Sequence, residues 1–129
     1  MIQENSPKVV STLNDTNGYL EYIQEGMREV VSAEDGGTAA SMFAGFEYVN
    51  DMAAKTGTAQ VSQIDLENTA WFVAYTPFEK PEIAVVVYIP NGYSGAYAAP
   101  TARDIMQFYR DRQKQEQNNN VTNPGGLVQ

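Results

Sequence analysis

The stretch that decides the fold is TAWFVAYT at residues 69–76, followed by EIAVVVYI at residues 82–89. Both runs are rich in β-branched and aromatic residues, which favour strands. The link between them, PFEKP at residues 77–81, has a length that favours an antiparallel hairpin. Because apolar residues run almost without a break from 83 to 89, we expect the second strand to be buried on both faces.

A third strand is predicted upstream of this hairpin. Residues 52–62 read MAAKTGTAQVS, a run of small and β-branched residues. Gly57 lies at its centre, where a side chain would normally pack. A glycine inside a strand often marks a place where another backbone approaches closely, so we expect such a contact here.

Helical patterns lie on either side of the three strands. Apolar residues three and four apart predict an amphipathic helix over 19–32, which Gly36 and Gly37 follow. A short helix is expected over 39–43, with Thr38 as its N-cap. Pro100 suits the first turn of a long helix over 99–114. Helices with an antiparallel sheet make the fold class α+β.

The composition excludes several kinds of function. The chain has 129 residues, with 8 Lys and Arg against 16 Asp and Glu, and its net charge is −8. It has no Cys and no His, which excludes thiolate and imidazole catalysis within it, and we expect no metal site and no cofactor. A chain this acidic, without a basic block, is not expected to bind nucleic acid.

The ends of the chain carry few signals. The apolar run at 83–89 is far shorter than the roughly 20 residues of a membrane helix, and residues 1–5 do not resemble a signal peptide. Taken alone, this would indicate a cytoplasmic protein. Residues 113–129 read QKQEQNNNVTNPGGLVQ, and we expect a polar, disordered tail there.

One motif indicates a functional site, namely Lys55-Thr56-Gly57-Thr58. It is not a phosphate-binding loop, because in that motif the lysine follows the glycine. K-T-G is one of three motifs of serine β-lactamases and penicillin-binding proteins. On an edge strand, Lys55 would reach into a groove to hold a carboxylate, and Thr58 would add its hydroxyl from the same side, with Thr56 on the opposite face. The Thr58 N–H would be an oxyanion donor, and Gly57 would let an extended substrate lie against the strand. The alternative is a plain strand with a solvated lysine.

The surrounding residues make the motif more specific. From about residue 19 to residue 109 the chain resembles the C-terminal part of the transpeptidase domain of a class B penicillin-binding protein. The segments that carry the resemblance are Gly26-Met27, Val30-Val31, Gly37-Thr38-Ala39, residues 54–60, Ala70-Trp71-Phe72-Val73, Tyr75-Thr76-Pro77, residues 82–89 and Ala98-Ala99-Pro100.

This resemblance implies a β-lactamase/transpeptidase-like fold and a serine acyl-enzyme mechanism. Such enzymes cross-link peptidoglycan stem peptides and are acylated by β-lactams. The resemblance implies that Lys55 and Thr58 hold the carboxylate of the substrate or drug, and that Thr56 and Gly57 line the cleft. It also implies an extracytoplasmic enzyme whose membrane anchor lies N-terminal to this chain, which replaces the cytoplasmic expectation.

The family's other two motifs are absent from the sequence. None of the six serines has a lysine three residues later or an asparagine two residues later. We therefore expect residues 1–112 to be the C-terminal portion of a transpeptidase domain, inactive alone. Its partner would be the missing N-terminal part of the domain, or a second copy of this chain paired through strand 82–89. The alternatives are a fragment of a serine β-lactamase or penicillin sensor, and a non-catalytic interaction module of the same fold.

Overall fold

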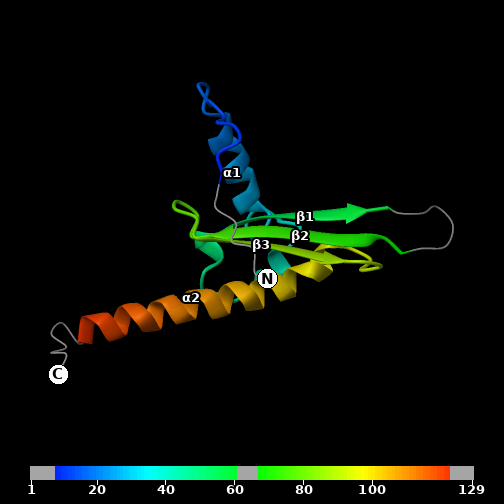
Figure 1. Cartoon of the computed structure of the whole chain (residues 1–129). Helices are drawn as coiled ribbons and strands as arrows, with labels where there is room; N and C mark the ends of the chain where they lie inside the picture. The colour runs from blue at the N-terminus through cyan, green and yellow to red at the C-terminus, as the bar shows by residue number, and fades with distance from the viewer. Residues whose placement is uncertain (1–7, 61–66, 123–129) are drawn as a thin grey trace, which may run out of the picture.

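The computed structural model describes residues 8–60 and 67–122. In chain order the elements are helix α1 (Tyr19–Glu29), the 3-10 helices η1 (Ala40–Phe43) and η2 (Val49–Asp51), strands β1 (Ala53–Ala59), β2 (Thr69–Thr76) and β3 (Ile83–Ile89), the 3-10 helix η3 (Gly95–Ala98) and helix α2 (Ala99–Thr122). The strands form one antiparallel sheet in the order β1-β2-β3, as Figure 1 shows. The predicted α+β class and the hairpin are confirmed.

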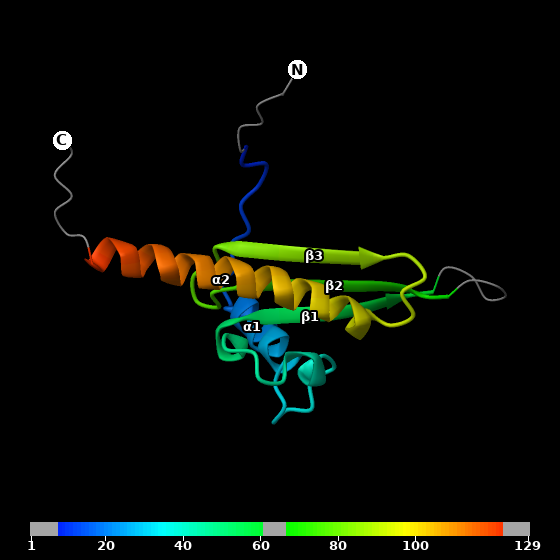
Figure 2. The same ribbon diagram turned by 90° about the horizontal axis from the view of Figure 1, so that it is seen from below.

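One face of the sheet forms the core. Ala70, Phe72 and Ala74 of β2 are buried on this face, and their β3 partners include Val85 and Val87. Helix α2 runs along this face and covers it, while α1 stands on the opposite side of the sheet (Figures 1 and 2). The helical side chains that join the core from α2 are Ala99, Ala102 and Met106.

The other face of β3 remains at the surface. Trp71, Val86 and Tyr88 share this face and are 40%, 63% and 52% exposed. The Trp71 and Tyr88 rings lean on each other, with centroids 4.5 Å apart. The expectation that β3 is buried on both faces is therefore wrong, because α1 packs against β1 on this side and leaves β3 uncovered.

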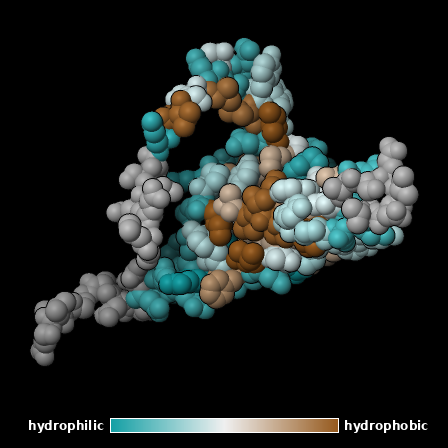
Figure 3. Space-filling view, turned by 45° about the vertical axis from the view of Figure 1, so that its right-hand side comes forward, coloured by the Kyte–Doolittle hydropathy of each residue, from teal (hydrophilic) through white to brown (hydrophobic). Residues whose placement is uncertain are grey.

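Helix α1 is amphipathic as predicted, but it ends at Glu29, three residues earlier than expected. Asp15 closes its N-terminus, because its carboxylate accepts the backbone N–H groups of Tyr19 and Leu20 at 2.9 and 2.8 Å. No side chain of α1 is buried. Apolar residues lie at the surface where the chain projects from the sheet, and a second group lies in the middle of the molecule (Figure 3). Leu20 and Ile23 of the apolar stripe of α1 are exposed, whereas Met27 is half-buried.

The turn after α1 is held by backbone contacts. The Gly37 N–H donates to the Ser32 carbonyl and the Ala39 N–H to the Val30 carbonyl, both at 2.9 Å. A Cβ at Gly37 would lie 2.2 Å from the Glu29 carbonyl oxygen. Only glycine fits this position, and its fit places the next residue, Thr38, beside β1.

We expect Gly37→Ala to lower the free energy of unfolding of the chain by about 2 kcal/mol, because the new methyl group would push the backbone of α1 away. Gly26→Ala is the matched control. It lies within α1 with open space around its Cβ position, so it should raise stability by about 0.5–1 kcal/mol. Urea unfolding followed by the fluorescence of the single tryptophan measures both. Equal effects of the two variants would contradict this account.

Helix α2 is longer than the sequence predicted. It runs from Ala99 to Thr122 instead of ending at 114, so residues 113–122, expected in a disordered tail, are helical. Its C-terminal half extends past the end of the sheet (Figures 1 and 2). Gln113 donates to Glu82 at 2.6 Å and Lys114 to Glu47 at 2.8 Å, which ties this half to the rest of the chain. Residues 123–129 lie outside the described part.

The first strand is shorter than predicted. β1 spans Ala53–Ala59, whereas a strand was expected over 52–62. Met52 is extended but precedes the paired residues, and the last two predicted positions lie outside the described residues.

Candidate functional site

The motif residues occupy the middle of β1, at one edge of the described sheet. In the register with β2, Gly57 pairs with Trp71, and a Cβ at Gly57 would lie 3.2 Å from the Trp71 Cβ. Lys55 and Gly57 therefore share the face of Trp71, while Thr56 and Thr58 share the core-side face. The expectation that Lys55 and Thr58 point to the same side is wrong, because residues three apart in a strand face opposite ways.

Thr58 is held by the segment that precedes α2. The Gly95 N–H of η3 donates to the Thr58 hydroxyl oxygen at 3.0 Å. Gly95 also touches the motif backbone, since a Cβ there would lie 2.5 Å from the Gly57 carbonyl oxygen. This confirms the predicted close backbone approach at Gly57. Because the Thr58 oxygen accepts from Gly95, its own hydrogen is left to be donated elsewhere.

Thr56 is held by the turn after α1. Its hydroxyl lies 3.0 Å from that of Thr38, and either oxygen can be the donor. Thr38 was predicted to be the N-cap of the short helix, and that prediction is wrong. Ala39 is the residue before η1 and makes no side-chain cap. The Thr38 hydroxyl is instead used to contact β1.

Lys55 supplies the positive charge of the site. Its side chain is exposed, and its Nζ folds back to donate to the Thr56 carbonyl at 2.7 Å. A lysine ammonium group has three donors, so this contact uses one of them. An edge strand with an ammonium group on one face and two hydroxyls on the other offers donors to an anion such as a carboxylate, which only accepts hydrogen bonds and is held best by charged donors.

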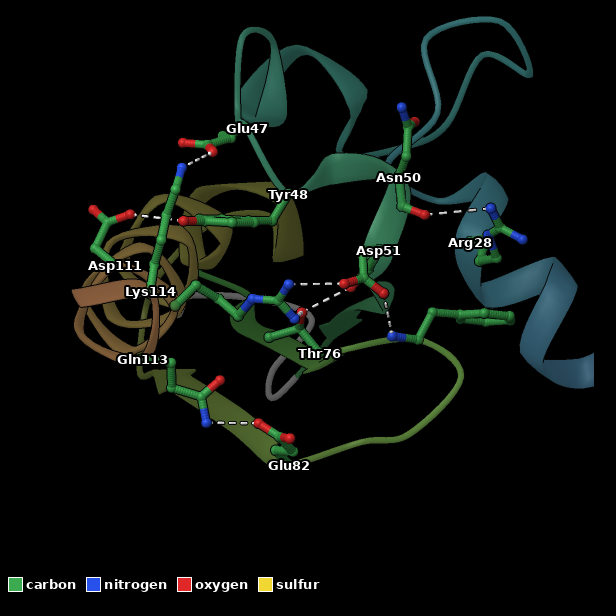
Figure 4. A network of polar contacts seen from close by, with 12 residues as sticks. Arg28, Glu47, Tyr48, Asn50, Asp51, Thr76, Glu82, Asp111, Gln113 and Lys114 are labelled. Carbon is green, nitrogen blue, oxygen red and sulfur yellow. Dashed lines mark hydrogen bonds and ion pairs between the residues drawn. The ribbon is translucent and has the colours of Figure 1, made fainter. Parts of the chain in front are cut away.

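A second cluster of polar residues ties α2 to the sheet, and sequence patterns did not reveal it (Figure 4). The Asp51 carboxylate accepts the Phe78 N–H at 2.8 Å and pairs with Arg110 at 2.9 Å. The Thr76 hydroxyl donates to the Asp51 carbonyl at 2.7 Å and accepts from Arg110 at 3.2 Å. The Arg110 guanidinium also lies over the Tyr48 ring, 4.8 Å from its centroid.

Ionisable groups next to this cluster have shifted pKa values. Hydrogen bonds from Gln107 and Tyr48 lower the pKa of the Asp111 carboxyl. Burial, together with the bond to Asp111, raises the pKa of the Tyr48 phenol. The hydrogen bond to Glu47 raises the pKa of Lys114. Each shift favours the protonation state that the contact needs, so the cluster serves to fix α2 in place.

Two further kinds of feature, a metal-binding cluster and a membrane-spanning helix, are absent from the described residues. Among residues 8–60 and 67–122, no three His, Cys, Asp or Glu side chains gather in a way that could hold a metal ion. In the same part of the chain, no helix has both the length and the apolar character to cross a membrane.

Relatives with named activities are similar over most of this chain. The peptidoglycan D,D-transpeptidase MrdA of Haemophilus influenzae is 34% identical over 119 residues, which cover 81% of this chain and 17% of that protein. Penicillin-binding protein H of Bacillus subtilis is 32% identical over 98 residues, which cover 70% of this chain and 13% of that protein. The chain thus spans less than a fifth of the length of either relative.

Solved structures agree with the sequence matches. PBP2 of Pseudomonas aeruginosa, in complex with WCK 5153, superposes with a TM-score of 0.65 at 31% identity and covers 80% of this chain and 23% of that one. PBP2 of Helicobacter pylori gives 0.65 at 30% identity, over 77% of this chain and 18% of that one. The family model for the penicillin-binding protein transpeptidase domain matches residues 2–107. By sequence and by fold, the chain belongs to the family of penicillin-binding protein transpeptidase domains.

Proposed function

We propose that this chain is the carboxylate-holding part of a peptidoglycan D,D-transpeptidase. The observation that supports this is the edge strand β1, which carries the Lys55 ammonium group and the hydroxyls of Thr56 and Thr58. In this proposal Lys55 and Thr58 bind the terminal carboxylate of a stem peptide or a β-lactam. Thr56 and Gly57 line the cleft, and the Thr58 N–H stabilises the oxyanion of the tetrahedral intermediate.

The two faces of β1 can serve one ligand because the strand lies at an edge of the described sheet. A lysine side chain is long, and that of Lys55 already bends back onto the backbone of β1. The ammonium group can thus reach over the edge from one side, while the threonine hydroxyls approach from the other. A carboxylate lying along the edge would receive donors from both.

The chemistry itself needs a nucleophile from another segment. In the proposed reaction a serine Oγ attacks the carbonyl of the D-Ala–D-Ala bond, and its proton passes through a base to the nitrogen of the departing D-Ala. The amine of a second stem peptide then attacks the resulting ester, and a proton of that amine returns through the base to the serine Oγ. No serine in this sequence has a lysine three residues later, so we assign the nucleophile to the part of the domain that precedes these residues.

The sheet has an edge to which the preceding part of the domain can add a strand. β3 is the last strand of the described sheet, and an unpaired strand edge recruits another strand. We propose that the preceding part of the domain pairs with β3, and that a second copy of this chain takes its place when that part is missing. We also propose that the complete enzyme acts outside the cytoplasmic membrane, which the family resemblance supports.

A joined protein tests the proposal. In it, this chain replaces the matching segment of the Haemophilus influenzae relative, directly behind the preceding part of that transpeptidase domain. We expect the joined protein to form a covalent adduct with a fluorescent penicillin, with the label on the preceding part. The isolated chain should take no label under the same conditions. A joined protein that unfolds cooperatively but takes no label would overturn the proposal, as would label on the isolated chain.

A further inference from the structure

We propose that Thr38 is a positioning residue that orients the Thr56 hydroxyl toward the bound carboxylate. This inference rests on the proposed function, and it assigns a role to a residue outside the motif. The observation that carries it is the 3.0 Å contact between the two hydroxyl oxygens, which joins the turn after α1 to β1. The two residues are 18 positions apart in the sequence, so the fold alone brings them together.

The direction of the contact follows from the chemistry of the ligand. A hydroxyl group has one hydrogen to donate and can accept two hydrogen bonds, whereas an ionised carboxylate can only accept. When a carboxylate lies against Thr56, the Thr56 hydrogen must point to it. The contact with Thr38 is then made by the Thr38 hydrogen, which donates to the Thr56 oxygen. The bound state is a chain of two hydroxyls ending at the carboxylate, in which each bond strengthens the next.

The same arrangement recurs at the next hydroxyl on this face. The Gly95 N–H donates to the Thr58 oxygen at 3.0 Å, and this leaves the Thr58 hydrogen for the ligand. Both threonines of β1 therefore receive a hydrogen bond from a neighbouring segment, one from η3 and one from the turn after α1. A pair of hydroxyls fixed as donors is suited to a carboxylate and unsuited to a cation.

Thr38 is placed firmly enough for this role. The turn that carries it is held by the Gly37 and Ala39 backbone N–H groups, each with a 2.9 Å bond to a carbonyl at the end of α1. The Thr38 side chain itself is exposed, and Thr56 is half-buried. Replacing the Thr38 hydroxyl thus removes the contact without opening a cavity in the core.

The experiment uses acylation of the joined protein by two penicillins, one with its carboxylate and one with that group esterified. We expect Thr38→Val to lower the second-order rate constant for the carboxylate probe by about 3- to 10-fold, the effect of losing one neutral hydrogen bond. Thr38→Ser keeps the hydroxyl and should retain the rate. With the ester probe, Thr38→Val and the unsubstituted protein should react at equal rates.

A double-substitution cycle separates positioning from a general structural effect. In a Thr56→Val background, Thr38→Val should cause no further loss, because the hydroxyl that it orients is gone. An unchanged rate in Thr38→Val, an equal loss with the ester probe, or an equal loss in the Thr56→Val background would each overturn the role of Thr38. If the unsubstituted joined protein is not acylated at all, the proposed function fails as well.

Discussion

Lys55→Ala in the joined protein will lower the rate constant of acylation by a carboxylate-bearing penicillin by about 10- to 100-fold. The substitution removes a charge-assisted hydrogen bond to the ligand, and bonds of that kind contribute about 1.5–3 kcal/mol. The chain carries a net charge of −8, so an anionic ligand meets repulsion that a local ammonium group must offset. The Lys55 Nζ is well placed for this, since it is exposed and already folds over the backbone of β1.

Lys80→Ala is the matched control for the Lys55 substitution. It changes the net charge by the same amount, and Lys80 is an exposed residue of the link between β2 and β3, outside the motif. Its rate constant should equal that of the unsubstituted protein. The penicillin ester gives a second check, because the loss caused by Lys55→Ala should shrink when the carboxylate is blocked. Equal losses in the two lysine variants would show that overall charge, and not a bound carboxylate, is responsible.

The largest stability effect is expected at Asp51, where we expect Asp51→Ala to lower the free energy of unfolding by about 2–4 kcal/mol. The substitution removes the ion pair with Arg110 and the bond from the Phe78 N–H. The Arg110 side chain is only 17% exposed, so its charge would be left with little water and without its partner. The Asp51 side chain is 42% exposed, and solvent screening therefore keeps the loss below that of a fully buried pair.

Glu116→Ala provides the comparison for an exposed pair. Glu116 contacts Arg112 at 3.0 Å, but the two side chains are 61% and 69% exposed. Removing such a pair should change stability by less than about 0.5 kcal/mol. Urea unfolding of both variants, followed by Trp71 fluorescence, measures the difference. Asp51→Ala and Glu116→Ala with the same midpoint would refute the importance of this cluster.

The sequence predicted the sheet well because its signals are local. Alternation of small and large apolar residues in β2 places Ala70, Phe72 and Ala74 on one buried face. The error at β3 arose because an apolar run does not reveal what covers each face. Val86 and Tyr88 have the composition of buried residues, yet within the described part of the chain no element covers them. Their character indicates that another segment covers this face of the sheet, which is separate from the strand addition proposed at the edge of β3.

The helix ends were harder to predict because tertiary contacts set them. Residues 113–122 look polar and disordered, but Gln, Lys and Glu are good helix formers, and two of them are tied to distant residues. Capping rules assigned Thr38 to η1, whereas its hydroxyl contacts β1. The pairing of Asp51 with Arg110 joins residues 59 apart in sequence. No pattern in a single sequence indicates which acidic residue meets which arginine.

The motif named the residues of the candidate site, but not their geometry. Lys55, Thr56, Gly57 and Thr58 all lie on β1, and their role in ligand binding stays a proposal. The period of a strand placed Thr56 and Thr58 together and Lys55 apart, which reverses the arrangement first expected. The sequence did not predict that Gly95 and Thr38 contact β1, because each reaches this strand only after the chain has folded.

The contact between Gly95 and Gly57 limits how this site can diverge. A side chain of any size at Gly95 would collide with the motif strand, and one at Gly57 would press on Trp71. Neighbouring residues thus confine β1 at this point. A larger side chain at Gly57 or Gly95 would require β1 or its neighbours to move. If the proposed function holds, differences in ligand preference among members that keep both glycines should therefore arise from the opposite wall of the proposed cleft, to which we assign the nucleophile.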